Sequence, residues 1–477
     1  MESLISNNPP LQYSTTPIIQ FRIRMPNILL VAGEASGDLH GGRLVQALKT
    51  LAPDCSFFGI GGEHMARAGM ELLFHIRDMA VVGFTEVIRH LPFLRRVMRT
   101  LEEEIEKRKP SVALLIDYPG FNLRLAERLR ARGIKVLFYI APQVWAWGAG
   151  RIPKMARVLD EMAVVFPFEV ELFQKAGLPT TFVGHPLLEG LTPELSRKDF
   201  FQRFAFEEER PLLGLLPGSR QHEIERLLPD MIATAQLLKT RLPNLQIGIA
   251  QAPTLPRELY ERYRTPQQDV LATASPLHKK NLRSQTPPNS KNLNPAEVGT
   301  APIVRATAWP LHEKNPSPPP LPQNLGSAEV GTLSDKPALA HDEIRLIDNA
   351  TYELMRESTA CLVCSGTATL ETACFGTPLV IVYRISRLSY EIGKRLVKLP
   401  YIGLVNVVAG RKIAPELVQQ QFTPQAAAEA LLPYLQNQSD RERASKELIT
   451  VREQLGTPGA SVRTAKIALR LAGELSS

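Results

Sequence analysis

The segment at 360–384 restricts the possible folds of this chain more than any other stretch. It reads ACLVCSGTATLETACFGTPLVIVYR, with an apolar run, a Ser-Gly-Thr turn, a helix-like stretch, a stop at Gly376 and a second apolar run. This order is typical of a strand–helix–strand unit with a right-handed crossover, the building block of a parallel sheet. The sequence therefore predicts an α/β fold with parallel strands.

The turn in this segment is a candidate phosphate site. Ser365, Gly366 and Thr367 lie between the end of a strand and the start of a helix, where unpaired N–H groups and the helix dipole favour an anion. Glu371 lies about one helical turn further on and is placed for a sugar hydroxyl. In the alternative interpretation Ser365 only caps the helix and Glu371 is a solvated acid, and this segment alone favours neither.

Length, charge and cysteine content narrow the class of protein. A chain of 477 residues exceeds one hydrophobic core, so two domains are expected. The formal charge of +8 suits a nucleotide or an acidic lipid surface, whereas the basic tail and interleaved aromatic residues of nucleic-acid-binding proteins are missing from the sequence. Cys361 and Cys364 lie inside an apolar run, where buried thiols are expected rather than a redox pair.

Two stretches depart from the α/β pattern. Residues 1–24 are polar and lack the apolar region of a signal peptide, so we expect a disordered extension before Met25. Residues 266–341 are rich in proline and repeat themselves, because ATASPLH returns as ATAWPLH and AEVGT occurs twice. A tract of this composition cannot bury enough apolar surface to fold, which predicts a duplicated, disordered insertion.

A glycine-rich segment follows the first strand, which is expected at 27–32. It contains Ser36 and Asp38 and precedes a helix expected at 42–51. Glycines at such a turn let the backbone approach a ligand or another domain. The GIGG sequence at 59–62 lacks the third glycine and the acidic ribose ligand of a dinucleotide fingerprint, so an NAD site is not predicted.

Asp117 is the strongest candidate for a catalytic base. The run 112–117 reads as a central strand that carries this carboxylate to its carboxyl end, where open parallel sheets bind their ligands. A carboxylate in this position can accept the proton of a hydroxyl nucleophile. The alternative is that Asp117 caps a helix that begins near Asn122. Further strands are expected at 135–140, 161–166 and 180–184.

Two aromatic or apolar stretches have two interpretations each. Trp145 and Trp147 lie in one loop, where they can stack on a sugar or an acyl chain or simply cover the core. The stretch 79–105 has the apolar spacing of an amphipathic helix that faces the core. Its apolar start and its arginines also suit an anionic membrane surface or acyl chains. The candidate contacts are then Met79, Val81, Val82 and Phe84.

A second α/β unit begins at Pro211. Its first strand, 212–216, ends in a turn that carries Arg220, whose guanidinium can clamp a diphosphate with two hydrogen bonds. Asn406 lies in an apolar setting, and Arg411 follows it closely. The rest of the chain is predicted to be helical, and its last helix is expected to pack back across the first domain.

Eight short motifs together resemble one family. They are GEASGD at 33–38, ID at 116–117, QVWAW at 143–147, FPFE at 166–169, GHP at 184–186, LPGSR at 216–220, SGTATLE at 365–371 and NVVAGR at 406–411. Through these motifs the chain resembles the lipid-A-disaccharide synthases from Met25 onward, apart from the proline-rich insertion.

The resemblance implies a fold and a division into domains. The fold is the glycosyltransferase B type, in which two Rossmann-like domains with parallel sheets face each other across a cleft. Residues 25–186 would form the domain that binds the acceptor and faces the membrane. Residues 187–265 and 342–477 would form the domain that binds the UDP-sugar donor.

The resemblance also implies a reaction. UDP-2,3-diacylglucosamine would donate its sugar, with inversion, to 2,3-diacylglucosamine 1-phosphate, giving lipid A disaccharide 1-phosphate and UDP. No cofactor and no metal would take part. The protein would be cytoplasmic and peripherally bound to the inner face of the inner membrane, and its oligomeric state is left open.

Roles on the donor side follow from the same resemblance. Arg220 and the backbone amides of 365–367 would stabilise the departing UDP, and Glu371 would hold the ribose. Asn406 and Arg411 would be further residues of the cleft.

On the acceptor side, Asp117 would take the proton of the acceptor hydroxyl. Ser36 and Asp38 would border the acceptor, and the stretch 79–84 would contact acyl chains at the membrane. The chain departs from the family pattern at Gly120, where an acidic residue is usual.

Two other functions remain as alternatives. One is another UDP-amino-sugar enzyme of the same fold, such as a peptidoglycan glucosaminyltransferase or a UDP-N-acetylglucosamine 2-epimerase. The apolar stretch at 79–94 argues against this alternative, because it suits an acylated substrate. The other is a non-catalytic glycolipid-binding protein. The joint presence of Asp117, Arg220 and Glu371 argues against this second alternative.

Overall fold

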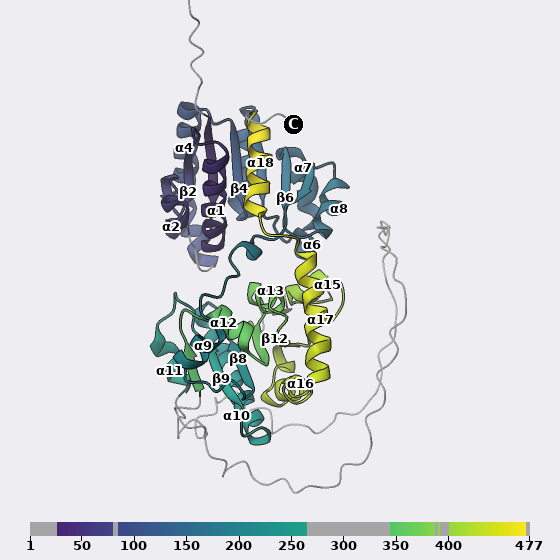
Figure 1. Ribbon diagram of the computed structural model, residues 1–477. Coiled ribbons are helices and arrows are strands. Elements are labelled where there is room, and N and C mark those ends of the chain that lie inside the picture. The colour runs from purple at the N-terminus through teal and green to yellow at the C-terminus, as the bar shows by residue number, and fades with distance from the viewer. Residues whose placement is uncertain (1–25, 80–83, 265–343, 387–389, 392–399, 474–477) are drawn as a thin grey trace, which may run out of the picture.

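The computed structural model describes residues 26–79, 84–264, 344–386, 390–391 and 400–473 (Figure 1). The extension expected at 1–24 and the insertion expected at 266–341 both lie outside these residues. The described residues form two parallel sheets, each with helices on both faces. The prediction of an α/β fold with two Rossmann-like domains is therefore confirmed.

The first sheet contains seven parallel strands in the order β3-β2-β1-β4-β5-β6-β7. Strand β1 pairs with β2 on one side and with β4 on the other, so the chain builds the sheet outward in both directions. All five residues of β4 are buried, as expected for a central strand that is covered on both faces. The strands are β1 (Asn27–Ala32), β2 (Ser56–Gly61), β3 (Glu71–His75), β4 (Val112–Ile116), β5 (Lys135–Tyr139), β6 (Glu161–Val164) and β7 (Thr180–Phe182).

Two helical layers cover the first sheet, because side chains of β1 alternate between two core clusters. Ile28 and Leu30 pack with α1 and with the last helix, α18, whereas Leu29 and Val31 pack with α4 and α5. The helices are α1 (Ala35–Leu51), α2 (Glu63–Arg67), α3 (Ile76–Met79), α4 (Phe84–Arg108), α5 (Pro119–Ala131), α6 (Val144–Trp147), α7 (Ile152–Val158), α8 (Phe168–Gln174) and α18 (Ala460–Ala472).

The second sheet contains six parallel strands in the order β10-β9-β8-β11-β12-β13. Leu213 and Leu215 of β8 face α10 and α16, and Leu212 and Leu216 face α12, α13 and α17. The strands are β8 (Leu212–Leu216), β9 (Gln246–Ala250), β10 (Ile344–Ile347), β11 (Ala360–Cys364), β12 (Leu379–Tyr383) and β13 (Glu416–Val418). The helices are α9 (Arg197–Arg203), α10 (Gln221–Arg241), α11 (Arg257–Arg264), α12 (Thr351–Glu357), α13 (Thr367–Cys374), α15 (Leu404–Ala409), α16 (Pro424–Gln436) and α17 (Gln438–Gln454).

The last helix returns to the first domain, as the sequence predicts. Helix α18 contacts α1, β4 and β5, and it lies beside α1 in Figure 1. Its first turn is held by Glu189, whose carboxylate accepts hydrogen bonds from the amide (2.7 Å) and the hydroxyl (2.6 Å) of Ser461. The chain thus ends in a helix that ties the two domains together.

The two chain segments that join the domains are bound to each other. The amide of His185 donates to the carbonyl of Leu455 at 2.8 Å. Gly184 and Gly456 both have a left-handed backbone, with φ of +79° and +86°, and a Cβ on Gly456 would lie 3.3 Å from the Cα of Gly184. Only glycines allow this crossing, because a side chain would be both strained and crowded.

Several local expectations were wrong. Helix α1 begins at Ala35 rather than at residue 42, so most of the glycine-rich segment is helical. Its glycines serve close packing instead of a ligand: a Cβ on Gly41 would lie 2.6 Å from the Sδ of Met65 in α2. The short edge strands β3 and β13 were not predicted, and the stretch 79–105 is divided between α3 and α4.

Among the described residues, no helix combines the length and the apolar composition that crossing a bilayer requires.

Candidate functional site

A cavity of about 470 Å³ lies at the carboxyl edge of the second sheet. The residues that follow β8, β9 and β11 form its walls, which is where parallel α/β sheets bind ligands. We call it the donor cavity, and five of the residues predicted for the donor line it: Arg220, Ser365, Gly366, Thr367 and Glu371.

The amino end of α13 opens into the donor cavity. Gly366 is the N-cap of this helix and no side chain caps the first turn. The hydroxyl of Ser365 donates instead to the carbonyl of Ile402 at 3.3 Å, so the alternative in which Ser365 caps the helix is wrong. The predicted role of the Ser365 amide is wrong, because this amide donates to the carbonyl of Val382 at 2.9 Å. The exposed N–H groups at Gly366 and Thr367 and the positive end of the helix dipole can bind an anion.

Glu371 is not a solvated acid. It lines the donor cavity and lies largely buried, and this burial raises its pKa to about 7. A hydrogen bond from the Tyr352 hydroxyl, 3.4 Å from Glu371 Oε1, acts in the opposite direction. A buried carboxylate in a sugar-sized cavity can accept hydrogen bonds from ligand hydroxyls.

Arg220 stands at the mouth of the donor cavity on a tight turn. Gly218 has a φ of +114°, and the carboxylate of Glu223 accepts hydrogen bonds from the amides of Ser219 (3.0 Å) and Arg220 (3.1 Å). The Arg220 side chain is 67% exposed and pairs loosely with Glu223 at 3.4 Å. Its guanidinium is therefore free to turn toward a diphosphate. Glu223, which shapes this turn, was not predicted from the sequence.

Asp117 follows β4 in a strained turn at the edge of the first sheet. Asp117 and Tyr118 both have positive φ, +47° and +50°, which is uncommon for non-glycine residues and typical of functional sites. The buried amide of Asn122 donates to the carbonyl of Asp117 at 2.7 Å and holds the turn. Tyr118 rather than Asp117 occupies the N-cap of α5, so the capping interpretation is wrong. The Asp117 carboxylate accepts a hydrogen bond from the backbone amide of Tyr118, which acts to lower its pKa.

The loop before α1 lies against this turn. A Cβ on Gly33 would fall 2.2 Å from the ring of Tyr118, so only glycine permits the contact. Burial and the nearby carboxylate of Glu34 raise the pKa of Asp117 to about 6. A base with a pKa near the working pH is well suited to proton transfer. Ser36, which was predicted to border the acceptor, is exposed in the first turn of α1. Glu34 was not predicted from the sequence as a residue of the site.

Replacing Glu34 by glutamine should lower the pKa of Asp117. The carboxylate of Glu34 repels the ionised form of Asp117, so its removal favours ionisation. Activity that depends on ionised Asp117 would then persist to lower pH, and the acid limb of the pH profile of kcat would move to lower pH. Glu127→Gln, on the exposed surface of α5, is the control and should leave the limb in place. An unmoved limb in Glu34→Gln would contradict the assignment.

Asp38, which was expected to border the acceptor, is buried inside the first domain. Its side chain is 3% exposed, and its carboxylate accepts hydrogen bonds from the amides of Gly62 (2.7 Å), His64 (3.0 Å) and Met65 (3.0 Å). Asp38 thereby caps α2 from a distance and fixes it to α1. Asp38 therefore has a structural role, because both oxygens of its carboxylate accept hydrogen bonds from amides of its own domain.

Asn406 and Arg411 are also placed away from the donor cavity. Asn406 is fully buried, and its side chain binds the amides of Ile413 (2.8 Å) and Ala414 (2.9 Å) and the carboxylate of Glu416 (2.8 Å). Arg411 is exposed and pairs with Glu447 of α17 at 3.2 Å. Neither lines the donor cavity, so their expected contact with the cleft is not supported.

Replacing Asn406 by alanine should loosen the loop that follows α15. The amides of Ile413 and Ala414, the carbonyl of Ala414 and the carboxylate of Glu416 would each lose one hydrogen bond, which corresponds to about 2–4 kcal/mol of local stability. Hydrogen exchange of the amides of Ile413 and Ala414 measures this loss directly. Arg411→Ala, which breaks only a surface ion pair, should cost less than about 1 kcal/mol. Unchanged protection together with a weaker affinity for UDP would instead return Asn406 to the binding site.

The expected acyl contacts are only partly described. Met79 is 1% exposed and belongs to the core of the first domain, so its expected contact with acyl chains is wrong. Val81, Val82 and the side chain of Phe84 lie outside the described residues. Pro92 lies inside α4, where Arg95, Arg96 and Arg99 are exposed.

Aromatic residues gather after β5 and β6. Trp145 donates to the carboxylate of Glu169 at 3.0 Å, and Phe166 stacks on Phe168 with ring centroids 5.6 Å apart. Phe168 is 39% exposed, whereas Glu169 is fully buried and its pKa is raised to about 7 by that burial. The buried Glu169 carboxylate thus joins the two aromatic loops. The side chain of Trp147 lies outside the described residues.

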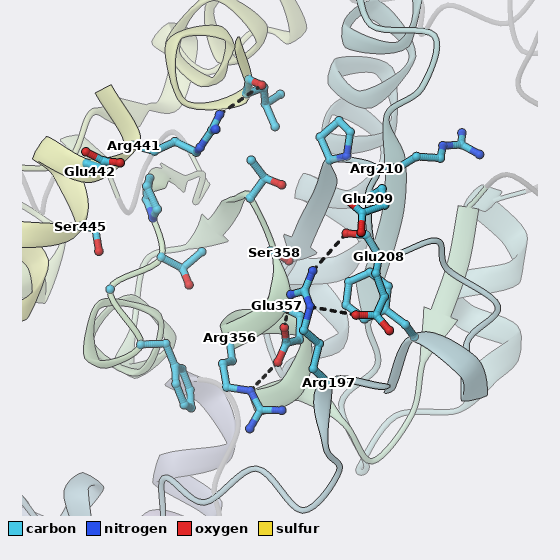
Figure 2. Close-up of a pocket in the computed structure, with 18 of the residues that line it drawn as sticks. Arg197, Glu208, Glu209, Arg210, Arg356, Glu357, Ser358, Arg441, Glu442 and Ser445 are labelled. Carbon is cyan, nitrogen blue, oxygen red and sulfur yellow. Dashed lines mark hydrogen bonds and ion pairs between the residues drawn. The ribbon is translucent and has the colours of Figure 1, made fainter. Parts of the chain in front are cut away.

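A second cavity, of about 600 Å³, lies at the opposite edge of the second sheet (Figure 2). Its walls include the residues just before β8, β11 and β12. Three of its charged side chains pair with one another: Glu357 binds Arg197 at 2.5 Å and Arg356 at 2.6 Å. None of the predicted site residues lines it, and parallel sheets bind ligands at their carboxyl edge, so we assign the site to the smaller donor cavity.

Comparison with known proteins decides the family. The sequence profile described as lipid-A-disaccharide synthetase matches residues 28–280 and 330–470. The lipid-A-disaccharide synthase of Geobacter metallireducens is 38% identical over 94% of this chain and 97% of its own length. The synthase of Syntrophus aciditrophicus is 37% identical over 93% of this chain and 97% of its own length.

The chain belongs to the lipid-A-disaccharide synthase family. Membership assigns it to the glycosyltransferases of lipid A biosynthesis, so the predicted family and enzyme class are confirmed. The non-catalytic alternative is thereby set aside.

Solved structures agree on the fold. A UDP-GlcNAc 2-epimerase from Neisseria meningitidis, bound to UDP-GlcNAc, superposes with a TM-score of 0.54 at 11% identity over 93% of this chain and all of its own. A calicheamicin glycosyltransferase superposes with a TM-score of 0.51 at 12% identity over 95% of this chain and all of its own. At such low identity the likeness establishes the glycosyltransferase B fold of the family and nothing about substrates.

Proposed function

We propose that this member of the lipid-A-disaccharide synthase family transfers 2,3-diacylglucosamine from UDP to the 6-hydroxyl of 2,3-diacylglucosamine 1-phosphate. The observation that carries the proposal is the donor cavity, in which Arg220, the uncapped start of α13 and the buried Glu371 lie together. The cationic side chain and the free amides match a diphosphate, and the carboxylate matches the hydroxyls of a ribose.

On the donor side, the bond between the anomeric carbon and the UDP oxygen breaks, and negative charge collects on the diphosphate. Arg220 and the amides of Gly366 and Thr367 stabilise that charge, which lowers the barrier to departure. Glu371 accepts hydrogen bonds from the ribose and holds the nucleotide in place.

On the acceptor side, Asp117 removes the proton of the attacking hydroxyl as the new bond to the anomeric carbon forms. Attack from the face opposite to the leaving UDP inverts that carbon. The proton ends on Asp117 and is released to solvent, because a pKa of about 6 keeps the free carboxylate ionised at neutral pH. Ser36 is exposed on the neighbouring loop, where the acceptor can meet it.

The lipid substrates place the first domain at a membrane surface in this proposal. Support comes from the exposed Arg95, Arg96 and Arg99 on α4 and from the formal charge of +8. Basic side chains beside an apolar stretch bind the anionic face of a bilayer. The protein would act as a peripheral enzyme on the cytoplasmic face of the inner membrane, with residues 25–186 toward the acceptor and 187–265 and 342–477 toward the donor. Helix α18 is the exception to this division, because it packs on the first sheet.

A transfer assay tests the proposal. Purified protein is given radiolabelled UDP-2,3-diacylglucosamine and 2,3-diacylglucosamine 1-phosphate, and the expected product is the labelled disaccharide 1-phosphate with one UDP released for each linkage. Parallel reactions contain UDP-N-acetylglucosamine alone or with a non-acylated acceptor. Turnover only in those reactions would assign the site to a UDP-amino-sugar enzyme with another substrate.

A further inference from the structure

Glu371 is held from behind by a tyrosine. The hydroxyl of Tyr352, in the first turn of α12, donates to Glu371 Oε1 at 3.4 Å, and hydrogen bonds in active sites commonly tighten when the ligand binds. Burial and the Glu371 carboxylate raise the pKa of Tyr352 to about 12, so the phenol keeps its proton and remains a donor.

Tyr352 does not belong to the wall of the donor cavity. Thr351 and Glu371 line that cavity, whereas Tyr352 lines a neighbouring cavity of about 250 Å³ together with Gly190 and Thr192 of the segment between the domains. Tyr352 does not contact the donor cavity directly, and the wall residue that its side chain reaches by a hydrogen bond is Glu371.

Helix α12 gives the tyrosine a fixed position. Oε1 of Glu353 accepts hydrogen bonds from the amides of Glu194 (2.6 Å) and Leu195 (2.8 Å), and Arg356 donates to the carbonyl of Leu195 at 2.8 Å. These bonds fasten the helix to the segment that joins the domains. The Tyr352 ring also packs on the Phe375 ring, with centroids 6.2 Å apart, so the hydroxyl is aimed at Glu371 by rigid surroundings.

We propose that Tyr352 is a positioning residue that holds the Glu371 carboxylate in the orientation needed to bind both hydroxyls of a ribose. The inference rests on the proposed role of Glu371 at the ribose of UDP. With one lone pair of Oε1 engaged by Tyr352, the other lone pairs of the carboxylate remain as acceptors for the 2'- and 3'-hydroxyls. A carboxylate held in this way discriminates against a 2'-deoxynucleotide, which leaves one acceptor unpaired.

Calorimetric titration with UDP and with 2'-deoxy-UDP tests this role. The wild-type protein should bind UDP more tightly than 2'-deoxy-UDP. Tyr352→Phe should weaken UDP binding about three- to tenfold, which is the effect of one lost hydrogen bond, and should change 2'-deoxy-UDP binding much less. The preference for the ribonucleotide would shrink, and in turnover KM for the donor would rise while kcat stays nearly constant.

A matched control and a double mutant separate positioning from packing. Tyr434→Phe, which alters another half-buried tyrosine of the same domain, should change neither affinity. In a Glu371→Ala background, Tyr352→Phe should have no further effect on UDP binding, because its partner is gone.

Equal weakening of both nucleotides, or an undiminished effect of Tyr352→Phe in the Glu371→Ala background, would overturn the inference. Unchanged UDP binding in Tyr352→Phe would do the same. A wild-type protein that binds neither nucleotide would place the failure in the proposed UDP site itself, so the two outcomes are distinguishable.

Discussion

Asp117→Asn should lower kcat of the transfer reaction by about 10²–10⁴-fold, the usual contribution of a general base. Asparagine is the sharpest replacement because it tolerates the positive φ of +47° at this position, which alanine would strain. It keeps the shape of the side chain but cannot accept the proton of the acceptor hydroxyl. A radiolabel assay of disaccharide formation at saturating substrates measures the loss.

Two comparisons make this result specific to proton transfer. UDP affinity should stay the same in Asp117→Asn, because Asp117 lies on the first sheet and the donor cavity on the second. Asp54→Ala, which removes an exposed carboxylate from the same domain, should keep full activity. The wild-type enzyme should also lose kcat as the pH falls below about 6, since protonated Asp117 cannot act as a base. A variant with near wild-type kcat would rule out Asp117 as the base.

Arg220→Ala should lower kcat/KM by about 10²–10³-fold, as expected when one group that stabilises a leaving anion is removed. The side chain is 67% exposed and its one described ion pair is the loose contact with Glu223, so the fold should tolerate the change. Arg220→Lys should recover only part of the activity, because an ammonium cannot bind a diphosphate with two parallel hydrogen bonds.

The control for Arg220 comes from the same helix. Arg241 lies in the last turn of α10, is half exposed, and pairs with Glu429 at 2.7 Å. Arg241→Ala therefore removes an equal charge and a surface ion pair, and it should leave kcat/KM unchanged. Unlike Asp117→Asn, Arg220→Ala should also weaken UDP binding. An equal loss of activity in Arg220→Ala and Arg241→Ala would show that long-range charge, and not contact with the diphosphate, explains the effect. Full activity in Arg220→Ala would rule out its role at the leaving group.

The donor side of the site could be read from the chain because it is local in sequence. Ser365, Gly366, Thr367 and Glu371 belong to one strand–turn–helix unit. The apolar runs of the strands and the helix-like stretch between them, all within 25 residues, are enough to place these residues at one edge of a sheet. Arg220 joins them because β8 and β11 are neighbours with aligned carboxyl ends. A parallel sheet converts the ends of its strands into one surface, so these residues meet without further information.

The polar motif residues Asp38 and Asn406 were misread for the opposite reason. A buried carboxylate that caps α2 and a buried amide that holds the loop before β13 have the same letters as ligand-binding residues. Their partners lie up to 27 positions away and become visible only when the segments pack together. The predicted acyl contact of Met79 was wrong for a similar reason. An apolar residue suits a lipid and a protein core equally well, and only its burial distinguishes the two environments.

The sequence by itself determined the α/β class, the parallel sheets, the family and the residues at the strand ends, since each depends on patterns within single segments and on the shared edge of a sheet. Only the tertiary structure decided which polar side chains stabilise the fold, that Glu34 lies near Asp117 and that Tyr352 contacts Glu371. Those relations join side chains from different elements, and hydrogen bonding and burial depend on distances in space that no local pattern encodes.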